Sequence, residues 1–182
     1  WEINMMNLNN GLFRIDTKGT TYAFRLSDGY LEQLYYGRRL VDEDFTAVSL
    51  KNTIDLGCTV KTESSKFYLE RNLLEYSGVG RGDYRHSPME LLMPDGTFVC
   101  DFVYESHRVI DGAYTTEGLP TAYGKAETLE ITLKDKKFDD LKLKLNYVVF
   151  EECDVICRNV ELINGTDGEV YIRKLMSLML DL

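Results

Sequence analysis

The segment LKLKLNYVV, residues 141–149, alternates apolar and polar side chains with a period of two. Successive side chains of a β-strand point to opposite faces, so this pattern predicts a strand with one buried face. The inward set is Leu141, Leu143, Leu145, Tyr147 and Val149, and the outward set is Lys142, Lys144 and Asn146. The run TLEITL, residues 128–133, repeats the alternation with an acidic and hydroxyl outer face. Both runs favour a sheet that packs on a hydrophobic core.

Turn signals separate further strand-like runs along the chain. They lie at residues 27–29 (SDG), 94–96 (PDG) and 164–168 (NGTDG). These turns predict three hairpins, which would pair 20–26 with 30–36, 89–93 with 97–109, and 155–163 with the last strand. Because no useful window carries apolar residues at a sustained helical period, the chain is predicted to be all-β. Its many antiparallel strands would need a sandwich or barrel to bury one face.

Two regions depart from the alternation. Residues 41–66 mix acidic, Ser, Thr and Asn residues with little periodicity, which indicates a long loop. Loops of this length in a compact domain are usually functional or mobile. Residues 175–182, LMSLMLDL, are apolar on both faces, so we expect a strand that enters a larger body at this point. No repeat, low-complexity tract or linker divides the chain, and residues 1–182 are expected to form one domain.

Composition narrows the classes of partner. Among 182 residues, 30 acidic and 21 basic side chains give a net charge of −9. Repulsion from phosphate groups argues against nucleic acid and against anionic membranes, whereas a neutral ligand such as a sugar is indifferent to this charge. No run approaches the length of a membrane span, and no signal peptide is visible.

The four cysteines show no metal-ligand spacing, and no cofactor or metal is expected. Cys153 and Cys157 would lie ~13 Å apart along a strand, which is too far for a disulfide between them. Isolated thiols are typical of a reducing compartment, so the expected location is the cytoplasm.

The stretch GVGRGDYRHSP, residues 78–88, contains the tripeptide of adhesion ligands. Adhesion requires the tripeptide at an exposed loop tip of an extracellular protein, and nothing in the sequence supports export. The alternative is a framework turn in which three glycines permit irregular backbone. Asp83 and Arg85 would then fix the turn through hydrogen bonds and a salt bridge.

Histidine and serine residues raise the question of a hydrolytic triad. In an extended segment Asp83 and Ser87 share a face, but His86 faces away, and no G-x-S-x-G elbow is present. His107 lies in a strand-like run, where a partly buried histidine bonded to a carboxylate or backbone group is favoured over a catalytic base. A pair of acids for glycoside chemistry is not marked by spacing, although 30 acidic residues leave it open. Most Tyr and Phe residues fall at inward strand positions.

Five runs closely resemble the N-terminal domain of glycoside hydrolase family 36 alpha-galactosidases, in one order along most of the chain. They are DGYLEQLYYGRRL (28–40), RGDYRHSPMELLMPDGTFVCDFVYESHRVIDG (81–112), EGLPTAYGKAETLEITLKD (117–135), LKLNYVVFEECDVICRNVELIN (143–164) and LMSLMLDL (175–182). The resemblance departs at residues 41–66, where members of the family vary.

The resemblance implies an antiparallel β-supersandwich of two large packed sheets, galactose mutarotase-like, that precedes a catalytic (β/α)8 barrel absent from this chain. The family's nucleophile is an aspartate in a K-W-D motif of the barrel, and a second aspartate is its acid/base. Neither motif occurs here, where Trp1 is the one tryptophan, so no catalytic residue is expected in this chain. The parent enzyme would remove terminal alpha-linked galactose from raffinose- or melibiose-type oligosaccharides with retention. The alternative is a free-standing carbohydrate-binding β-sandwich module.

The same resemblance implies roles for single residues. Many members are tetramers in which a loop of this domain reaches a neighbour's active site, and residues 41–66 occupy the corresponding place. Asp44 and Phe45 are the candidate sugar contacts, since an acid can bond hydroxyl groups and a ring can stack. Asp83, Arg85 and His107 are expected to be structural polar groups. The segment itself would scaffold and oligomerise the enzyme, and would be inactive alone.

Overall fold

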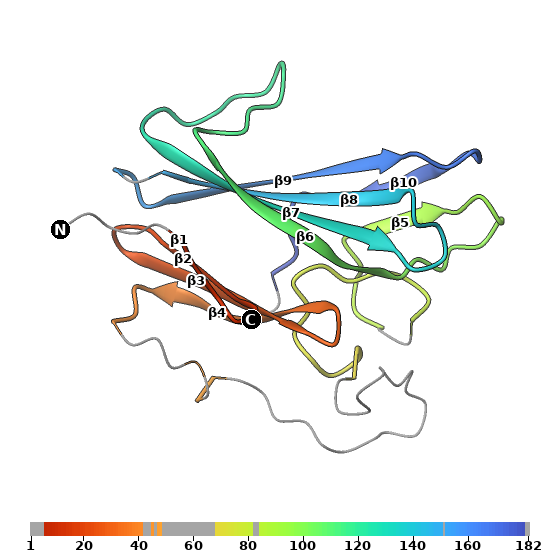
Figure 1. The fold of residues 1–182 in the computed structure, drawn as a ribbon, viewed down its shortest axis with the longest axis horizontal. Coiled ribbons are helices and arrows are strands. Elements are labelled where there is room, and N and C mark those ends of the chain that lie inside the picture. Colours follow the sequence, from red (N-terminus) through yellow and green to blue (C-terminus); the bar gives the residue numbers. More distant parts are fainter. Residues whose placement is uncertain are drawn as a thin grey trace.

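The computed structural model describes residues 6–41, 45, 47–48, 68–81, 84–150 and 152–180. This part of the chain forms ten β-strands and contains no helix, so none of its segments is a helix able to cross a membrane. The strands are β1 Met6–Asn9, β2 Leu12–Asp16, β3 Thr20–Ser27, β4 Tyr30–Arg38, β5 Met89–Leu92, β6 Phe102–Asp111, β7 Ala126–Asp135, β8 Leu141–Phe150, β9 Val155–Asn164 and β10 Tyr171–Leu175 (Figure 1).

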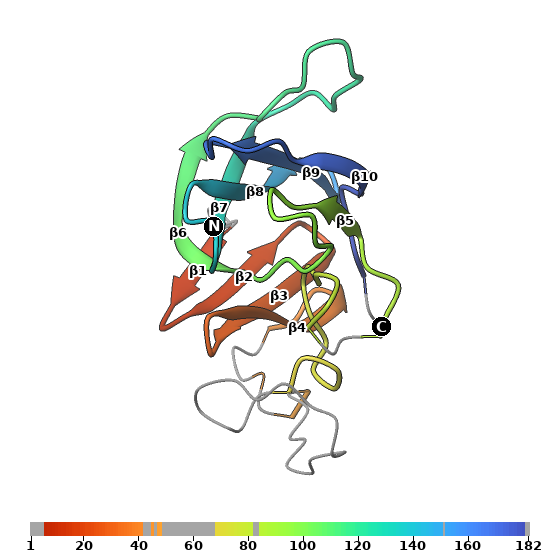
Figure 2. The same ribbon diagram turned by 90° about the vertical axis from the view of Figure 1, so that its right-hand side faces the viewer.

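Two four-stranded antiparallel sheets face each other as a sandwich (Figures 1 and 2). The first has the order β1-β2-β3-β4 and the second the order β6-β7-β8-β9, while β5 and β10 form a separate pair. The predicted all-β sandwich is therefore confirmed.

The first sheet is built from consecutive hairpins. The predicted pairing of 20–26 with 30–36 is confirmed as β3 with β4, and its turn residues Asp28 and Gly29 have φ of 50° and 84°. A second hairpin joins β1 to β2 through Asn10 and Gly11, with φ of 50° and 79°. Positive φ at both central residues gives the type I′ turn, whose twist matches that of the strands. The Asn-Gly pair at this second turn is a signal that the sequence analysis did not use.

For the other two predicted hairpins, the turns form but the predicted strand pairing is wrong. A tight turn does form at 94–96, where the Met93 N–H donates to the Thr97 carbonyl at 2.8 Å, but residues 97–101 form no strand. The turn after β9 also forms, with the Asn164 amide donating to the Gly168 carbonyl at 2.9 Å. Beyond these turns β5 pairs with β10 instead, so each of the two strands satisfies the other's backbone hydrogen bonds.

The core lies between the two large sheets. All five residues of the predicted inward set of β8 are fully buried, from Leu141 to Val149, which confirms that set. The outer face is less exposed than the alternation predicted, because Asn146, Thr128 and Glu130 are buried too. Aromatic rings fill the space between the sheets. Phe13 stacks on its neighbour Phe24 within the first sheet at 5.1 Å, and Phe24 stacks on Tyr147 of the second sheet at 5.0 Å. The inward placement expected for these rings is therefore confirmed.

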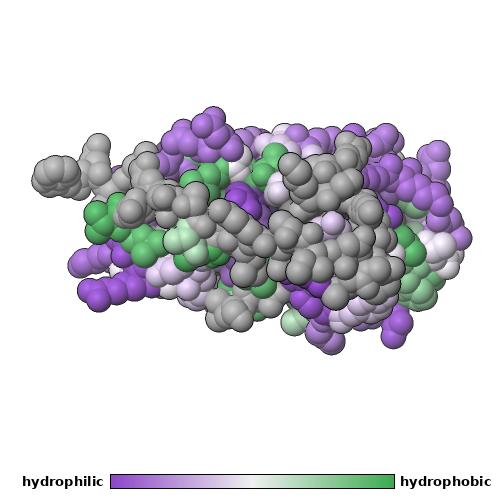
Figure 3. Space-filling model, turned by 90° about the horizontal axis from the view of Figure 1, so that it is seen from below, coloured by the Kyte–Doolittle hydropathy of each residue, from purple (hydrophilic) through white to green (hydrophobic). Residues whose placement is uncertain are grey.

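The last residues of β8 are buried on both faces. Val148 and Phe150 point away from the main core, yet they are buried with Ala126 in a second cluster. Ala113, Tyr114 and Ala122 of the β6–β7 connection pack on this cluster. The connection projects beyond the sheets in Figure 2, and its base supplies the cover. Seen from below, described apolar residues gather in separate small patches among polar ones (Figure 3).

Candidate functional site

The glycine-rich stretch at residues 78–88 is a turn that approaches neighbouring backbone closely. Gly80 has φ of 89°, and a side chain at Gly78 would lie 2.9 Å from the Cys100 carbonyl oxygen. Arg81 turns toward the domain, where its Nε lies 3.1 Å from Oδ2 of Asp101. Gly82 and Asp83 lie outside the described residues, so the expected role of Asp83 stays a prediction. Because Arg81 is engaged with Asp101, it is not presented as an adhesion ligand requires.

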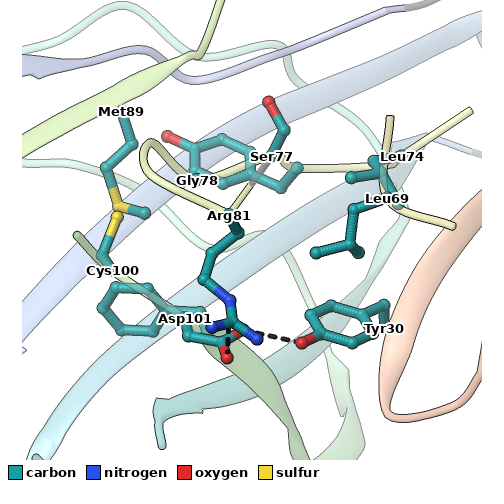
Figure 4. A pocket seen from close by; sticks show the side chains of 11 residues that line it. Tyr30, Leu69, Leu74, Ser77, Gly78, Arg81, Met89, Cys100 and Asp101 are labelled. Carbon is teal, nitrogen blue, oxygen red and sulfur yellow. Dashed lines mark hydrogen bonds and ion pairs between the residues drawn. The ribbon is translucent and has the colours of Figure 1, made fainter. Parts of the chain in front are cut away.

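Arg81, Asp101 and Tyr30 converge on a small cavity beside this turn (Figure 4). The Tyr30 hydroxyl donates to Oδ1 of Asp101 at 2.7 Å, and Lys136 Nζ lies 3.8 Å from the other oxygen. Burial raises the pKa of Tyr30, and the hydrogen bond to the Asp101 carboxylate raises it further. The cavity encloses about 20 Å³, which is room for about one water and not for a sugar ring.

Cys100 lines the same cavity, and its thiol is expected to be unreactive. Burial raises the pKa of its thiol to about 11, so the thiolate that a nucleophile needs is scarce at neutral pH. Cys100, Cys153 and Cys157 are all free thiols, so the predicted absence of a disulfide between Cys153 and Cys157 agrees with the structure. Among the described residues no group of three His, Cys, Asp or Glu side chains could hold a metal ion.

Ser87 and His86 do not form a nucleophile and base. The Ser87 hydroxyl is buried and lies 2.7 Å from the Met89 carbonyl and 3.0 Å from the Ser77 carbonyl. His86 is exposed, and its Nε2 lies 3.3 Å from Lys174 Nζ. Ser87 thus closes a local backbone turn, in agreement with the rejection of a triad.

Arg85 and His107 make local polar contacts. The Arg85 guanidinium donates to the Leu69 carbonyl at 2.6 Å, which ties the turn to the preceding segment. His107 is exposed rather than partly buried, and its Nδ1 pairs with the Tyr104 hydroxyl at 2.6 Å, not with the expected carboxylate or backbone group. A bulge between Tyr104 and Ser106 inserts one extra residue, which brings positions 104 and 107 to the same face of β6.

Of the two candidate sugar contacts, the structure describes Phe45. Asp44 lies outside the described residues. Phe45 is 6% exposed and packs with Ala23 and Leu34, while the Arg14 guanidinium lies 5.9 Å from its ring centroid. Within this chain the Phe45 ring is covered by its own domain, and its contact with a sugar stays a prediction.

A buried polar cluster between the sheets is the feature that the sequence analysis missed. Glu75 is fully buried and accepts hydrogen bonds from the hydroxyl groups of Tyr22 and Tyr147, the latter at 2.7 Å. Arg158 Nη1 lies 3.3 Å from Glu75 Oε1, and its guanidinium carbon lies 3.8 Å above the Tyr147 ring. The available signal was a positive charge at an inward position of the alternating strand β9, between Ile156 and Val160.

Burial governs the electrostatics of this cluster. It raises the pKa of Glu75, although Arg158 and the two tyrosine hydroxyls act in the opposite direction. It also raises the pKa of Tyr22 and of Tyr147 well above the ordinary value, with Glu75 adding to the effect. The cluster links two sheets and the segment before β5, and its carboxyl group has no exposed surface on which to meet a substrate.

Comparison with known proteins gives the family. Residues 29–182 match the Glycosyl hydrolase family 36 N-terminal domain. The bifunctional alpha-galactosidase/sucrose kinase AgaSK of Mediterraneibacter gnavus is 31% identical over 180 residues, which cover 96% of this chain and 19% of that protein. Alpha-galactosidase Mel36A of Lactobacillus acidophilus is 30% identical over 181 residues, which cover 94% of this chain and 24% of the relative.

Solved structures agree with this assignment. The alpha-galactosidase AgaA of Geobacillus stearothermophilus superposes with a TM-score of 0.83 at 26% identity, over 92% of this chain and 24% of that one. Variants of AgaA have been solved with raffinose and with stachyose. The present chain thus spans about a quarter or less of the length of these relatives. The fold, the matched residues and the relatives together place the chain in glycosyl hydrolase family 36, as an N-terminal domain of that family.

Proposed function

We propose that this chain is the N-terminal accessory domain of a longer alpha-galactosidase whose catalytic (β/α)8 barrel lies outside these 182 residues. The family match over residues 29–182 carries the proposal. Further support comes from relatives named as alpha-galactosidases, of which the chain spans about a quarter or less.

The parent enzyme would hydrolyse terminal alpha-galactosides of the raffinose and melibiose type with retention. Support for this substrate class comes from the AgaA complexes with raffinose and stachyose. Retention requires two carboxyl groups ~5–5.5 Å apart on either side of the scissile bond. The two carboxylates described above are already engaged: the half-buried Asp101 by Arg81 and Tyr30, and the buried Glu75 by Arg158 and two tyrosines. In this proposal the reactive pair therefore belongs to the barrel.

The domain would scaffold the enzyme, join its copies into an oligomer, and lend residues 41–66 to a neighbouring active site. Asp44 and Phe45 are the proposed contacts with sugar in that loop. The proposed location is the cytoplasm, which agrees with three free thiols among the described residues. Mass photometry of the parent with and without residues 1–182 tests oligomerisation, and loss of assembly is the expected result.

Turnover of a nitrophenyl alpha-galactoside tests the central proposal. The full-length parent should release nitrophenol and the purified 182-residue chain should not. Turnover by the short chain would refute the assignment of the chemistry to the barrel. An inactive parent would refute the assignment to an alpha-galactosidase. Binding of galactose or raffinose by the isolated chain in calorimetry would instead favour the carbohydrate-binding module.

A further inference from the structure

Arg158 has buried donors that lack acceptors. Its side chain is 5% exposed, and within the described part of the chain no group accepts a hydrogen bond from its Nε, Nη1 or Nη2. Glu75 compensates the charge at 3.3 Å but does not align with these N–H groups as a hydrogen-bond acceptor. A buried donor without an acceptor costs ~1–3 kcal/mol, and more when it is charged. Such a group calls for an additional oxygen atom.

A pocket opens beside this guanidinium. It is lined by Tyr22, Tyr36, Ile156, Arg158, Leu178 and Leu180, and it encloses about 80 Å³. Strands β4 and β9, which carry Tyr36 and the two residues Ile156 and Arg158, are the edge strands of the two large sheets. The pocket therefore lies where the sandwich is open at its side, next to the segment that follows β10.

The rim of the pocket is apolar and exposed. Tyr36 is 47% exposed and Leu178 is 43% exposed. Met176, which does not line the pocket but lies two residues before Leu178 in the chain, is 46% exposed. Exposed apolar side chains that surround a recess are typical of contact surfaces rather than of ordinary solvent-facing positions. In this rim they belong to two segments far apart in sequence.

Size and charge define what the pocket can accept. A volume of 80 Å³ is well below the ~300–1,000 Å³ of small-molecule sites, so a sugar ring does not fit. The volume suits one aliphatic side chain. Because Glu75 already neutralises Arg158, an added carboxylate would leave an unpaired buried charge, whereas a neutral carbonyl would not. The fitting occupant is a peptide segment with an apolar side chain and a free backbone carbonyl.

We propose that this pocket, which we call the Arg158 socket, receives such a segment from the part of the parent enzyme outside these 182 residues. The inference rests on the proposed function, since it requires a longer parent chain. The carbonyl would accept hydrogen bonds from Arg158, and the side chain would pack on Tyr36 and Leu178. The socket would thus hold the accessory domain against the remainder of the enzyme.

Hydroxyl-radical footprinting tests the socket without any substitution. Tyr36 and Met176 should be labelled at least ~3-fold less in the full-length parent than in the 182-residue chain, because an interface excludes water from its central residues. Tyr171, 57% exposed on β10, serves as the reference. Equal labelling of Tyr36 and Met176 in the two proteins would overturn the proposal and would leave water as the occupant.

A pair of variants supplies the energetic test. Leu178→Asp should lower the urea midpoint of the parent more than that of the 182-residue chain, because Leu178 is 43% exposed in the chain alone and would be fully covered only in the parent. Val109→Asp, at 46% exposure on β6, is the matched control and should shift both proteins equally. Equal shifts for Leu178→Asp would count against the socket. Nitrophenol release is measured in parallel: an inactive parent with a protected socket would refute the proposed function alone.

Discussion

Removing the charge of Arg158 should destabilise the domain strongly. In Arg158→Met the Glu75 carboxylate stays fully buried with two tyrosine donors but loses its cation, which lies 3.3 Å away in the wild type. Breaking a buried ion pair on one side costs ~3–5 kcal/mol. The variant also loses the cation–π contact with Tyr147, in which the guanidinium carbon lies 3.8 Å from the ring centroid. Since a domain is stable by ~5–15 kcal/mol in total, a loss of ~3–5 kcal/mol would remove at least about a fifth of the free energy of unfolding, and most of it if the domain is marginally stable.

The loss should depend on pH in a defined direction. Burial raises the pKa of Glu75 above its ordinary value of 4.5, so the folded state binds this proton more tightly than the unfolded state. A carboxyl group whose pKa is raised by folding contributes its full stabilisation when the pH is below the pKa that it has in the unfolded state. This contribution is lost as the pH rises through the pKa that it has in the folded state. Without Arg158 the carboxylate has less compensation, so Arg158→Met should be less damaging at pH 5 than at pH 7.

Urea unfolding followed by far-UV circular dichroism at both pH values measures the effect. The double variant Glu75→Gln with Arg158→Met should lose less free energy of unfolding than the two single variants lose in sum. Lys134→Met is the control, because Lys134 pairs with Asp139 at 3.2 Å while the two side chains are 37% and 76% exposed, and it should cost at most ~1 kcal/mol. A cost below ~1 kcal/mol for Arg158→Met at pH 7 would refute the argument from buried charge.

Three further predictions concern the core, a thiol and a surface carboxylate. Leu145→Ala should cost ~2–5 kcal/mol in urea unfolding, since Leu145 is fully buried, whereas Leu119→Ala at an exposed position should stay within ~0.5 kcal/mol; equal costs would contradict the assigned core. Cys100, with a pKa of about 11, should resist a thiol reagent at pH 8 in the folded protein and react after unfolding, as read by peptide mass spectrometry; rapid labelling of the folded chain would be inconsistent with its burial. The hydrogen bond from Lys137 holds the pKa of Asp95 near 2, so its stabilising effect is present above the ordinary value of 3.8 and lost as the pH falls toward 2. Lys137→Met should move this pKa upward in an NMR titration of the carboxyl carbon, and an unchanged titration would exclude the proposed cause.

The local part of the fold could be predicted from the sequence. The alternation at residues 141–149 gave the buried face of β8 residue by residue, because the period of two is set by backbone geometry alone. The Asp28-Gly29 turn gave the β3–β4 pairing, because a two-residue turn fixes the register of its strands. In each case the deciding information lies within a few residues.

The remaining features depend on contacts between distant segments. The turn residues could not predict the pairing of β5 with β10. Pro94 and Asn164 do mark turns, but the strands next to these turns pair with strands other than the ones that the turns connect. The contact of Glu75 with Arg158 likewise forms only after both sheets have packed. The family could be identified from matching runs of residues, but the candidate contacts Asp44 and Phe45 rest on the resemblance alone.

The ribbon of β5 and β10 also sets a delay during synthesis on the ribosome. Met89–Leu92 emerges long before Tyr171–Leu175, and β5 has no other strand partner among the described residues. At ~5–20 residues per second, its backbone would wait on the order of 10 s before its hydrogen bonds are satisfied. During that interval the nascent chain carries an open strand edge that chaperones, or a second nascent chain, can occupy.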